Sequence, residues 1–404
     1  MILKRTSRVI LAVVIAVSAM AVPTFAVSEA SSITDDWDGT ADTSWYTSSG
    51  TVFNLDSAED LAGLASLVNS GTNFTGKTVN LTVNVRLNTT AATGVTSGQR
   101  EWTPIGGAAA GYSFKGTFDG NDNTISNIYY NHTDGSYSKG NSVKNNIGLF
   151  GKVEEGATVK NVKLVGGYVA AQRSVGSVAG KSWGTVDNCT SSVIVYGTET
   201  KGTGGLVGAN WVNTASNPPV IKNCSYSGTV TSASSNGSVG GIAGENEGAV
   251  YNCYNTGSVN GSYNVGGIVG SNQNNINQNS GTLVYGSVAN CYNTGTIAGG
   301  TYAGGIAGYC NYSVQNCYNI GTVTGTNAGA IIGQLTGSGN VVSVYYLTGT
   351  SAVATGATSG TLSVSPIVRK SDLKDSLNLW IQSGSVYSTW TTSSNVNNGY
   401  PYFA

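Results

Sequence analysis

Residues 240–259 read GGIAGENEGAVYNCYNTGSV, and the same order of glycine, aliphatic and asparagine positions returns along residues 147–350. The unit has two halves, G-G-I-x-G and V-x-N-C, followed by a short Gly-Ser/Thr-Val piece. The closing glycines of the first half are Gly151, Gly180, Gly208, Gly244, Gly270, Gly308 and Gly333, spaced by 25 to 38 residues. Three short strands and three turns need about 25 residues, which is one coil of a stacked solenoid.

The second half of the unit predicts which side chains face the core. Alternate residues of a strand share one side, so the valine and the cysteine of V-x-N-C both point inward. The inward cysteine position holds Cys189, Cys224, Cys253, Cys291 and Cys317, with Val162 and Val344 in equivalent places. Because valine replaces cysteine there, we expect a buried column of thiols. Three disulfides are the alternative, since six cysteines in an exported protein ordinarily pair.

The asparagine before each cysteine predicts a second column. Its members are Asn161, Asn188, Asn223, Asn252, Asn290 and Asn316. Asparagine tolerates left-handed backbone geometry, and stacked amides can hydrogen-bond along a fibre-like axis. A shorter column is expected at Asn210, Asn246 and Asn272, continued by Cys310. The outward residues Lys160, Asp187 and Lys222 alternate in sign, so we expect Asp187 to pair within the sheet and not to act as a catalytic acid.

These repeats resemble the GLUG-motif repeats of bacterial surface and secreted proteins, which also occur in adhesin-like and immunoglobulin-A-protease-associated regions. Further segments are similar to the family's usual lead-in and ending: Ser57–Leu61, Leu67–Gly71, Trp102–Gly106, Phe118–Gly120 and Gly399–Phe403. No protease domain follows the repeats, so we expect no protease activity. The predicted fold is all-β, a right-handed parallel β-helix of about seven coils whose N- and C-terminal caps contain short helices.

The ends of a solenoid expose unpaired strands and need caps. We therefore divide the chain into a signal peptide (1–26), an N-terminal cap with the first strands (27–146), the repeats (147–350) and a C-terminal cap (351–404). Helices are predicted at 57–70, with Ser57 as N-cap, and through Leu373, Leu377 and Trp380, with Ser371 as N-cap. Strands are predicted at 78–87, 114–128 and near 400–403, and residues 351–368 as a linker or a degenerate coil.

The first residues predict export. Lys4, Arg5 and Arg8 precede an apolar stretch from Val9 to Val22, and Thr24-Phe25-Ala26 places small residues for cleavage after Ala26, with Ala30 as the fallback site. A transmembrane anchor is the alternative, but the apolar run is about 14 residues where a span needs about 20. We expect a secreted or bacterial cell-surface protein with no membrane insertion after signal removal.

Composition favours a folded chain without chemistry of its own. Hydrophobic residues make up 40% and the net charge is −1, whereas disorder combines low hydrophobicity with high net charge. Near-neutral charge with one histidine also disfavours a nucleic-acid partner. Residues 248–368 contain no Asp, Glu, Lys, Arg or His, the groups that acid–base catalysis and carboxylate metal sites require. We expect no enzymatic activity, no cofactor and no metal.

Aromatic residues give the first candidate for ligand contact. Tyr254, Tyr292, Tyr318 and Tyr345 each follow the inward position and should form an outward column that could stack on an extracellular glycan or dock a protein. They could equally cover the sheet or pack beneath the insertion at 271–287. Should recognition lie elsewhere, the insertions at 210–219 and 271–287 are the next candidates.

Three further hypotheses remain open in the sequence. A polysaccharide lyase or hydrolase would draw on the acids of the N-terminal half, namely Asp119, Asp122, Glu154, Glu155, Glu245 and Glu247. Calcium could be held by Asp35, Asp36, Asp38 and Asp42, which lack EF-hand spacing. Ice binding through Thr294, Thr296 and Thr322 is disfavoured because coils of uneven length spoil a flat face.

Overall fold

The computed structural model describes residues 35–107, 112–134, 144–199, 201–214, 217–276, 283–337, 339–351, 353–358, 362–381 and 385–404. These residues belong to one compact unit. The predicted signal peptide lies outside the described residues. Neither helix in the described part of the chain has the length and apolarity of a membrane span.

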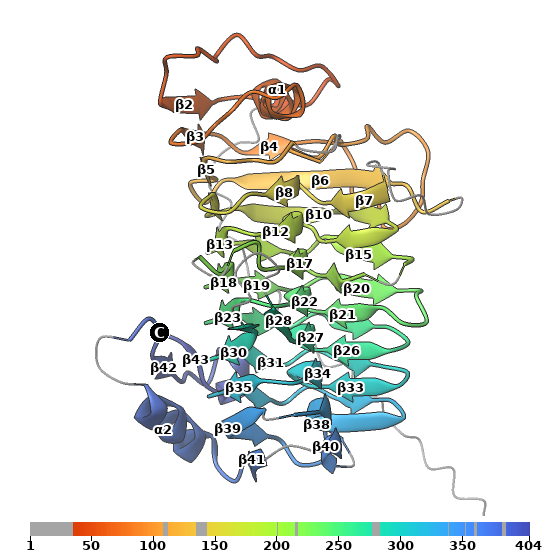
Figure 1. The fold of residues 1–404 in the computed structure, drawn as a ribbon, viewed down its shortest axis with the longest axis vertical. Coiled ribbons are helices and arrows are strands. Elements are labelled where there is room, and N and C mark those ends of the chain that lie inside the picture. The colour runs from red at the N-terminus through yellow and green to blue at the C-terminus, as the bar shows by residue number, and fades with distance from the viewer. Residues whose placement is uncertain are drawn as a thin grey trace, which may run out of the picture. The chain divides into compact units, whose positions relative to one another are not determined.

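Strands of successive repeats stack in parallel, so the repeat region is a parallel β-helix, as predicted (Figure 1). The V-x-N stack contains β9 (Thr158–Lys160), β13 (Thr185–Asp187), β18 (Val220–Lys222), β23 (Ala249–Tyr251), β30 (Ser287–Ala289), β35 (Ser313–Gln315) and β39 (Asn340–Tyr346). Next along the chain comes the stack of β14 (Thr190–Ser191), β19 (Ser225–Tyr226), β24 (Tyr254–Asn255), β31 (Tyr292–Asn293) and β36 (Tyr318–Asn319). A third stack contains β10 (Lys163–Ala171), β15 (Ile194–Gly197), β20 (Thr229–Ser232), β25 (Ser258–Asn260), β32 (Ile297–Ala298) and β37 (Val323–Thr324).

The glycine-rich half of each repeat forms a second sheet. Its first stack contains β7 (Asn145–Ile147), β11 (Arg173–Val175), β16 (Thr203–Gly204), β21 (Ser238–Gly240), β26 (Asn264–Gly266) and β33 (Tyr302–Gly304). Its second stack contains β8 (Phe150–Val153), β12 (Ala179–Ser182), β17 (Val207–Asn210), β22 (Ala243–Asn246), β27 (Val269–Asn272) and β34 (Ala307–Cys310), and β38 (Asn327–Leu335) joins both. A two-stranded antiparallel hairpin, β28 (Asn274–Ile276) with β29 (Leu283–Tyr285), projects from the long insertion.

The glycines of the motif are needed because backbones meet there. A Cβ added to Gly240 would lie 2.0 Å from the carbonyl oxygen of Ala243, and one added to Gly244 would lie 2.3 Å from the amide nitrogen of Thr203. Contacts between side-chain carbon and backbone cannot be this short. Any side chain at Gly240 or Gly244 would therefore push these backbones apart.

The N-terminal segment contains the predicted helix, and strands lie within both predicted strand ranges. Strands β1 (Asp35–Asp36), β2 (Val52–Leu55), β3 (Thr78–Leu81), β4 (Val85–Arg86), β5 (Thr117–Asp119) and β6 (Thr124–Asn131) lead into the first repeats. The helix α1 (Ala58–Asn69) begins after Ser57, whose side chain accepts a hydrogen bond from the Asp60 amide, as expected of an N-cap. The predicted strands at 78–87 and 114–128 are each divided in two.

At the C-terminal end, the prediction of the helix cap was wrong. The helix α2 (Lys370–Trp380) has Arg369 as its N-cap residue, without a side-chain cap bond, and the Ser371 hydroxyl donates to Asp372 instead. Among the described residues of the segment 351–368, which was predicted as a linker or a degenerate coil, β40 (Val353–Thr358) pairs with β38 and β41 (Leu362–Pro366) with β39. The chain then ends in β42 (Trp390–Thr391), a short 3-10 turn (Asn397–Gly399) and β43 (Tyr402–Phe403).

All six cysteines are free and buried, so the structure contains the thiol column that the Val/Cys exchange predicts. The Cys224 thiol, for example, donates to the carbonyl oxygen of Lys222 at 2.9 Å. Burial raises the pKa of Cys224 and Cys253 well above the usual value, and the thiolate is the reactive form.

We therefore predict that the native thiols react slowly with a maleimide or disulfide reagent. Labelling of all six should become complete only after denaturation, because both access and ionisation are suppressed in the fold. The check is a time course by intact-protein mass spectrometry with and without denaturant. Rapid labelling of all six native thiols would contradict the inward assignment.

Candidate functional site

The predicted tyrosine column exists and points away from the main core. Tyr254, Tyr292, Tyr318 and Tyr345 lie in register on neighbouring strands. The rings of Tyr254 and Tyr292 are stacked with centroids 4.8 Å apart, and those of Tyr292 and Tyr318 are 5.1 Å apart. However, Tyr292 and Tyr318 retain only 4% and 0% of their surface exposed.

The C-terminal segment covers the central rings of this column. Trp390 packs against Tyr292 and Tyr318 with ring centroids 5.8 and 5.6 Å away, and Leu373 and Leu377 of α2 join the same cluster. The Asn397 amide donates to the Tyr318 hydroxyl at 2.7 Å. Ligand contact at the two central rings would require this segment to move; the ligand-binding role of the column stays a prediction.

The asparagines before the cysteines adopt the left-handed conformation, with φ between 49° and 56°. Their side chains stack by hydrogen bonds: Asn188 to Asn161 at 2.8 Å, Asn252 to Asn223 at 2.9 Å, Asn290 to Asn252 at 2.8 Å and Asn316 to Asn290 at 2.7 Å. Between Asn188 and Asn223 the stack is interrupted, because the Asn223 amide donates to the Asp187 carboxylate instead. The shorter predicted column also stacks, with Asn210 donating to Asn246 and Asn246 to Asn272, each at 2.8 Å.

One asparagine column was missed. Asn255 donates to Asn293 and Asn293 to Asn319, each at 2.7 Å, and all three are fully buried. The signal was present as the last letter of the recurring N-C-Y-N. Its inward direction follows from the residue's place two positions beyond the inward cysteine.

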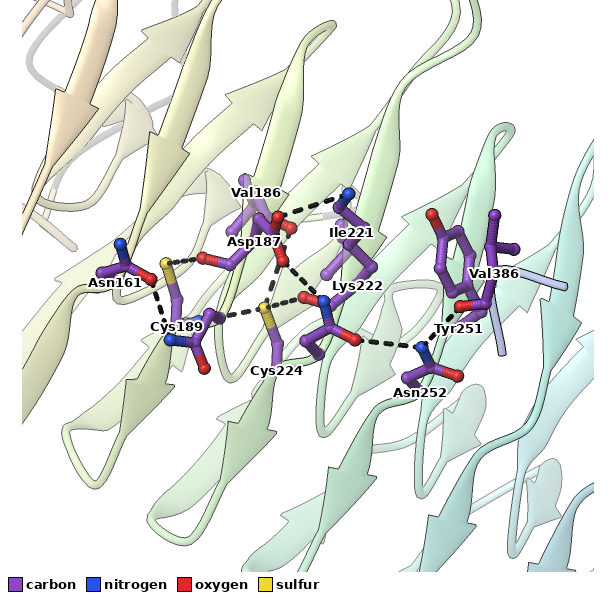
Figure 2. Close-up of polar contacts among 12 residues, drawn as sticks. Asn161, Val186, Asp187, Cys189, Ile221, Lys222, Cys224, Tyr251, Asn252 and Val386 are labelled. Carbon is purple, nitrogen blue, oxygen red and sulfur yellow. Dashed lines mark hydrogen bonds and ion pairs between the residues drawn. The ribbon is translucent and has the colours of Figure 1, made fainter. Parts of the chain in front are cut away.

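Asp187 is a pairing residue within the sheet, as expected. Its carboxylate lies 3.3 Å from the Lys222 ammonium, and Figure 2 shows the two side chains together on the outer face. Lys160, in contrast, pairs with Asp119 at 2.8 Å. The predicted alternation in sign therefore holds along the stack and continues to Asp119.

The acids of the hydrolase hypothesis are mostly dispersed. Asp122 pairs with Lys163 at 3.3 Å, and Glu154 accepts from the Ser113 hydroxyl at 2.6 Å. Glu155 accepts from the amide of Asn213 at 3.1 Å. Glu247 contributes to the raised pKa of Glu245, so these two carboxylates lie near each other.

Three of the four N-terminal acids of the calcium hypothesis are engaged locally, and the side chain of Asp35 lies outside what the structure describes. Asp36 pairs with Arg86, Asp38 accepts from Thr40 at 2.6 Å and Asp42 from Ser44 at 3.0 Å. Across the described ranges, no three acids, histidines or cysteines gather as potential metal ligands.

Basic and aromatic side chains do converge at one corner of the glycine-rich sheet. We call Lys152, Lys181, Lys201, Trp183 and Trp211 the lysine–tryptophan cluster. The Lys181 nitrogen lies 4.7 Å from the centre of the Trp183 ring and 4.0 Å from that of Trp211. The Lys201 nitrogen lies over the same Trp211 ring at 4.8 Å. Burial lowers the pKa of Lys181 to about 8.

Two buried carboxylates border this cluster and anchor both insertions. The Trp211 indole donates to Glu245 at 2.9 Å. Glu247 accepts from the Val212 backbone amide at 3.1 Å and from the Asn275 side chain at 2.6 Å. Burial raises the pKa of both glutamates. The insertions at 210–219 and 271–287 therefore meet at Glu247, beside the lysine–tryptophan cluster.

Neither the cluster nor its acids belong to the repeated positions that define the fold. The sequence nevertheless held one signal: Glu247 is the last charged residue before the long charge-free stretch. Together the side chains of the cluster can bind a ligand: the aromatic faces by stacking, and the ammonium groups by charge-assisted hydrogen bonds.

Comparisons with known proteins agree with the sequence resemblance. The family profile of the GLUG motif matches residues 235–260 and 261–298. Halomucin of Haloquadratum walsbyi is 32% identical over 177 residues, which is 44% of this chain and 2% of that protein. A candidate Gly-rich membrane protein of Evansella cellulosilytica is 34% identical over 95 residues, 23% of this chain and 10% of that protein. The chain thus spans at most a tenth of either curated relative.

A solved structure shares the fold. It is that of a candidate immunoglobulin A1 protease from Bacteroides ovatus, with a TM-score of 0.50 and 20% identity, covering 87% of this chain and 91% of that one. At this identity the likeness concerns the fold alone.

Proposed function

We propose that this protein is an extracellular or cell-surface β-solenoid that binds a glycan or a protein and does not catalyse a reaction. The GLUG repeats and the relatives, one of them named as a Gly-rich membrane protein, support a place at the cell surface. The parallel β-helix gives a regular scaffold on which irregular insertions can act as recognition segments.

The observation that carries the proposal is the corner where the periodic surface is interrupted. Two insertions meet there around Glu247, next to half-buried Trp183 and Trp211. Aromatic rings flanked by fixed polar groups are typical of recognition sites. Of the outward side chains described above, Lys160, Asp187 and Lys222 form ion pairs, and Tyr292 and Tyr318 are covered by the C-terminal segment.

The test is binding of the purified protein to glycan and extracellular-matrix protein arrays. We expect one ligand class to be retained, and Trp183→Ala to weaken its binding while the circular dichroism spectrum stays unchanged. Trp37→Ala is unsuitable as a control because that ring is buried; Tyr112→Ala, whose side chain is exposed, is suitable. Absence of specific binding on both arrays would overturn the proposal.

We further predict that no polysaccharide is cleaved. Glu245 and Glu247 lie together, but each carboxylate already accepts hydrogen bonds that fix an insertion, and both are buried. Incubation with uronate and neutral polymers should release no reducing ends and no unsaturated products. Turnover that Glu245→Gln abolishes would show that these acids catalyse and would refute the non-catalytic assignment.

A further inference from the structure

The three lysines of the lysine–tryptophan cluster lie unusually close for like charges. Lys152 and Lys181 are directly opposite each other on the neighbouring parallel strands β8 and β12. Lys181 and Lys201 both form cation–π contacts with the Trp211 ring. Like charges in register destabilise a sheet, so the fold alone does not account for this arrangement.

Two of these ammonium groups lack an acceptor. Within the described ranges, neither Lys181 nor Lys201 forms an ion pair or donates a hydrogen bond; their contacts are with the Trp183 and Trp211 rings. A cation–π contact holds an ammonium group in place. The ring does not neutralise the positive charge, however, and it has no oxygen that could accept a hydrogen bond from the N–H groups. Both half-buried lysines therefore retain donors and charge for a ligand.

The neighbouring glutamates do not complete the pairing. Ala209 is the register partner of both Lys181 and Glu245 on the stacked strands, so it lies between them. Glu245 and Glu247 accept their hydrogen bonds from Trp211, Val212 and Asn275. They attract Lys181 only from beyond ion-pair distance, and they are two carboxylates beside three ammonium groups. The cluster thus carries an excess of positive charge beside apolar indole surface.

From this geometry we propose that the lysine–tryptophan cluster binds the carboxylate or sulfate groups of an acidic polysaccharide. The proposal rests on the binding function above and names its ligand class. The Lys181 and Lys201 ammonium groups lie over the same Trp211 ring, 4.0 and 4.8 Å from its centre, so neighbouring oxyanions of one polymer can each meet an ammonium group. The exposed parts of Trp183 and Trp211 lie beside those charges and offer an apolar surface to a sugar ring.

The test compares three immobilised polymers: polygalacturonate, dextran sulfate and neutral dextran. We expect the purified protein to bind at least one of the two acidic polymers and not dextran. The Lys181→Gln/Lys201→Gln variant should lose roughly 100-fold in affinity, because two charge-assisted contacts disappear. Added salt should weaken wild-type binding.

A matched control removes the same charge elsewhere. Lys163 and Lys222 are ion-paired with Asp122 and Asp187 on the other sheet, so Lys163→Gln/Lys222→Gln should change the affinity by less than about threefold. Lys181→Arg keeps the charge and should retain binding.

The pH dependence gives a second readout. Lys181 has a pKa of about 8, so its charge, and with it the affinity, should fall as the pH rises through 8. Lys152 and Lys201, which repel it, and Glu245 and Glu247, which attract it, are the charged groups facing it. In Lys181→Arg the loss near pH 8 should disappear, since arginine stays protonated. A merely structural lysine would not show this difference.

The outcomes separate the two proposals. If the protein binds another glycan or protein on the arrays but neither acidic polymer, the ligand class is wrong and the binding function stands. Unchanged acidic-polymer affinity in Lys181→Gln/Lys201→Gln would likewise overturn the site. If nothing binds on the arrays or the polymers, both proposals fail together.

Discussion

Replacing Gly266 by alanine is expected to lower the free energy of unfolding by at least about 4 kcal/mol. Gly266 ends β26 and opens one copy of the glycine motif. A Cβ at this position would lie 1.9 Å from the carbonyl oxygen of Val269 and 2.7 Å from the amide nitrogen of Gly308. Both atoms belong to the backbone, one of the next coil, so no side-chain rotation can relieve the overlap. The stacking of two coils must be disturbed.

Gly94→Ala is the matched control. A Cβ at Gly94 meets no atom within 4 Å, and the φ of Gly94 is outside the left-handed region. The free energy of unfolding of this variant should therefore lie within about 0.5 kcal/mol of the wild-type value. Urea denaturation followed by circular dichroism compares the two, with limited proteolysis to locate the opened coils. If Gly266→Ala were as stable as Gly94→Ala, the recurring glycines would not be explained by close backbone approach.

The repeated positions could be predicted because each coil presents the same physical problem. Every coil needs an inward aliphatic or thiol side chain, a left-handed bend and a glycine where backbones meet. Because every coil meets these requirements with the same residue types, those residue types recur at regular intervals in the sequence. Val250, Asn252 and Cys253 therefore predicted the surroundings of Val288, Asn290 and Cys291 without any structure.

The C-terminal contacts could not be predicted, because they occur once. The direction of the tyrosine column followed from the alternation of the strand, but its burial depends on Trp390 and α2, which are far away in sequence. No repeat in the sequence indicates such a contact. The amphipathic pattern of residues 370–380 predicted a helix and an apolar face, yet not the surface on which that face would lie.

The lysine–tryptophan cluster was missed for a related reason. Lys181 and Trp183 stand at variable positions of one repeat, and Trp211 opens an insertion. Each residue alone resembles an ordinary surface residue. The insertions at 210–219 and 271–287 were recognised as alternatives for recognition; that they meet at Glu247 depends on hydrogen bonds that only the fold reveals.

Replacing Asn290 by glycine is expected to lower the free energy of unfolding by about 3–5 kcal/mol and to release the C-terminal segment. The Asn290 amide donates to Asn252 and to the carbonyl oxygen of Ser388, at 2.8 and 2.9 Å. Its oxygen accepts from Asn316 and from the Trp390 indole, both at 2.7 Å. The variant leaves several buried polar groups without a partner, and each such group costs about 1–3 kcal/mol. Glycine tolerates φ of +52°, so backbone strain does not contribute.

Asn188→Gly separates the amide stack itself from this buried junction. Asn188 has a similar φ of 49° and donates to Asn161 at 2.8 Å, but it is exposed, so water can replace the lost contact and the cost should be about 1 kcal/mol. Proteolysis should remove residues near the C-terminus from Asn290→Gly and leave Asn188→Gly intact, because Asn290 holds both Ser388 and Trp390. Equal stability and equal protease resistance of the two variants would mean that apolar packing alone retains the segment. In that case the tyrosine column would stay covered even without the asparagine stack.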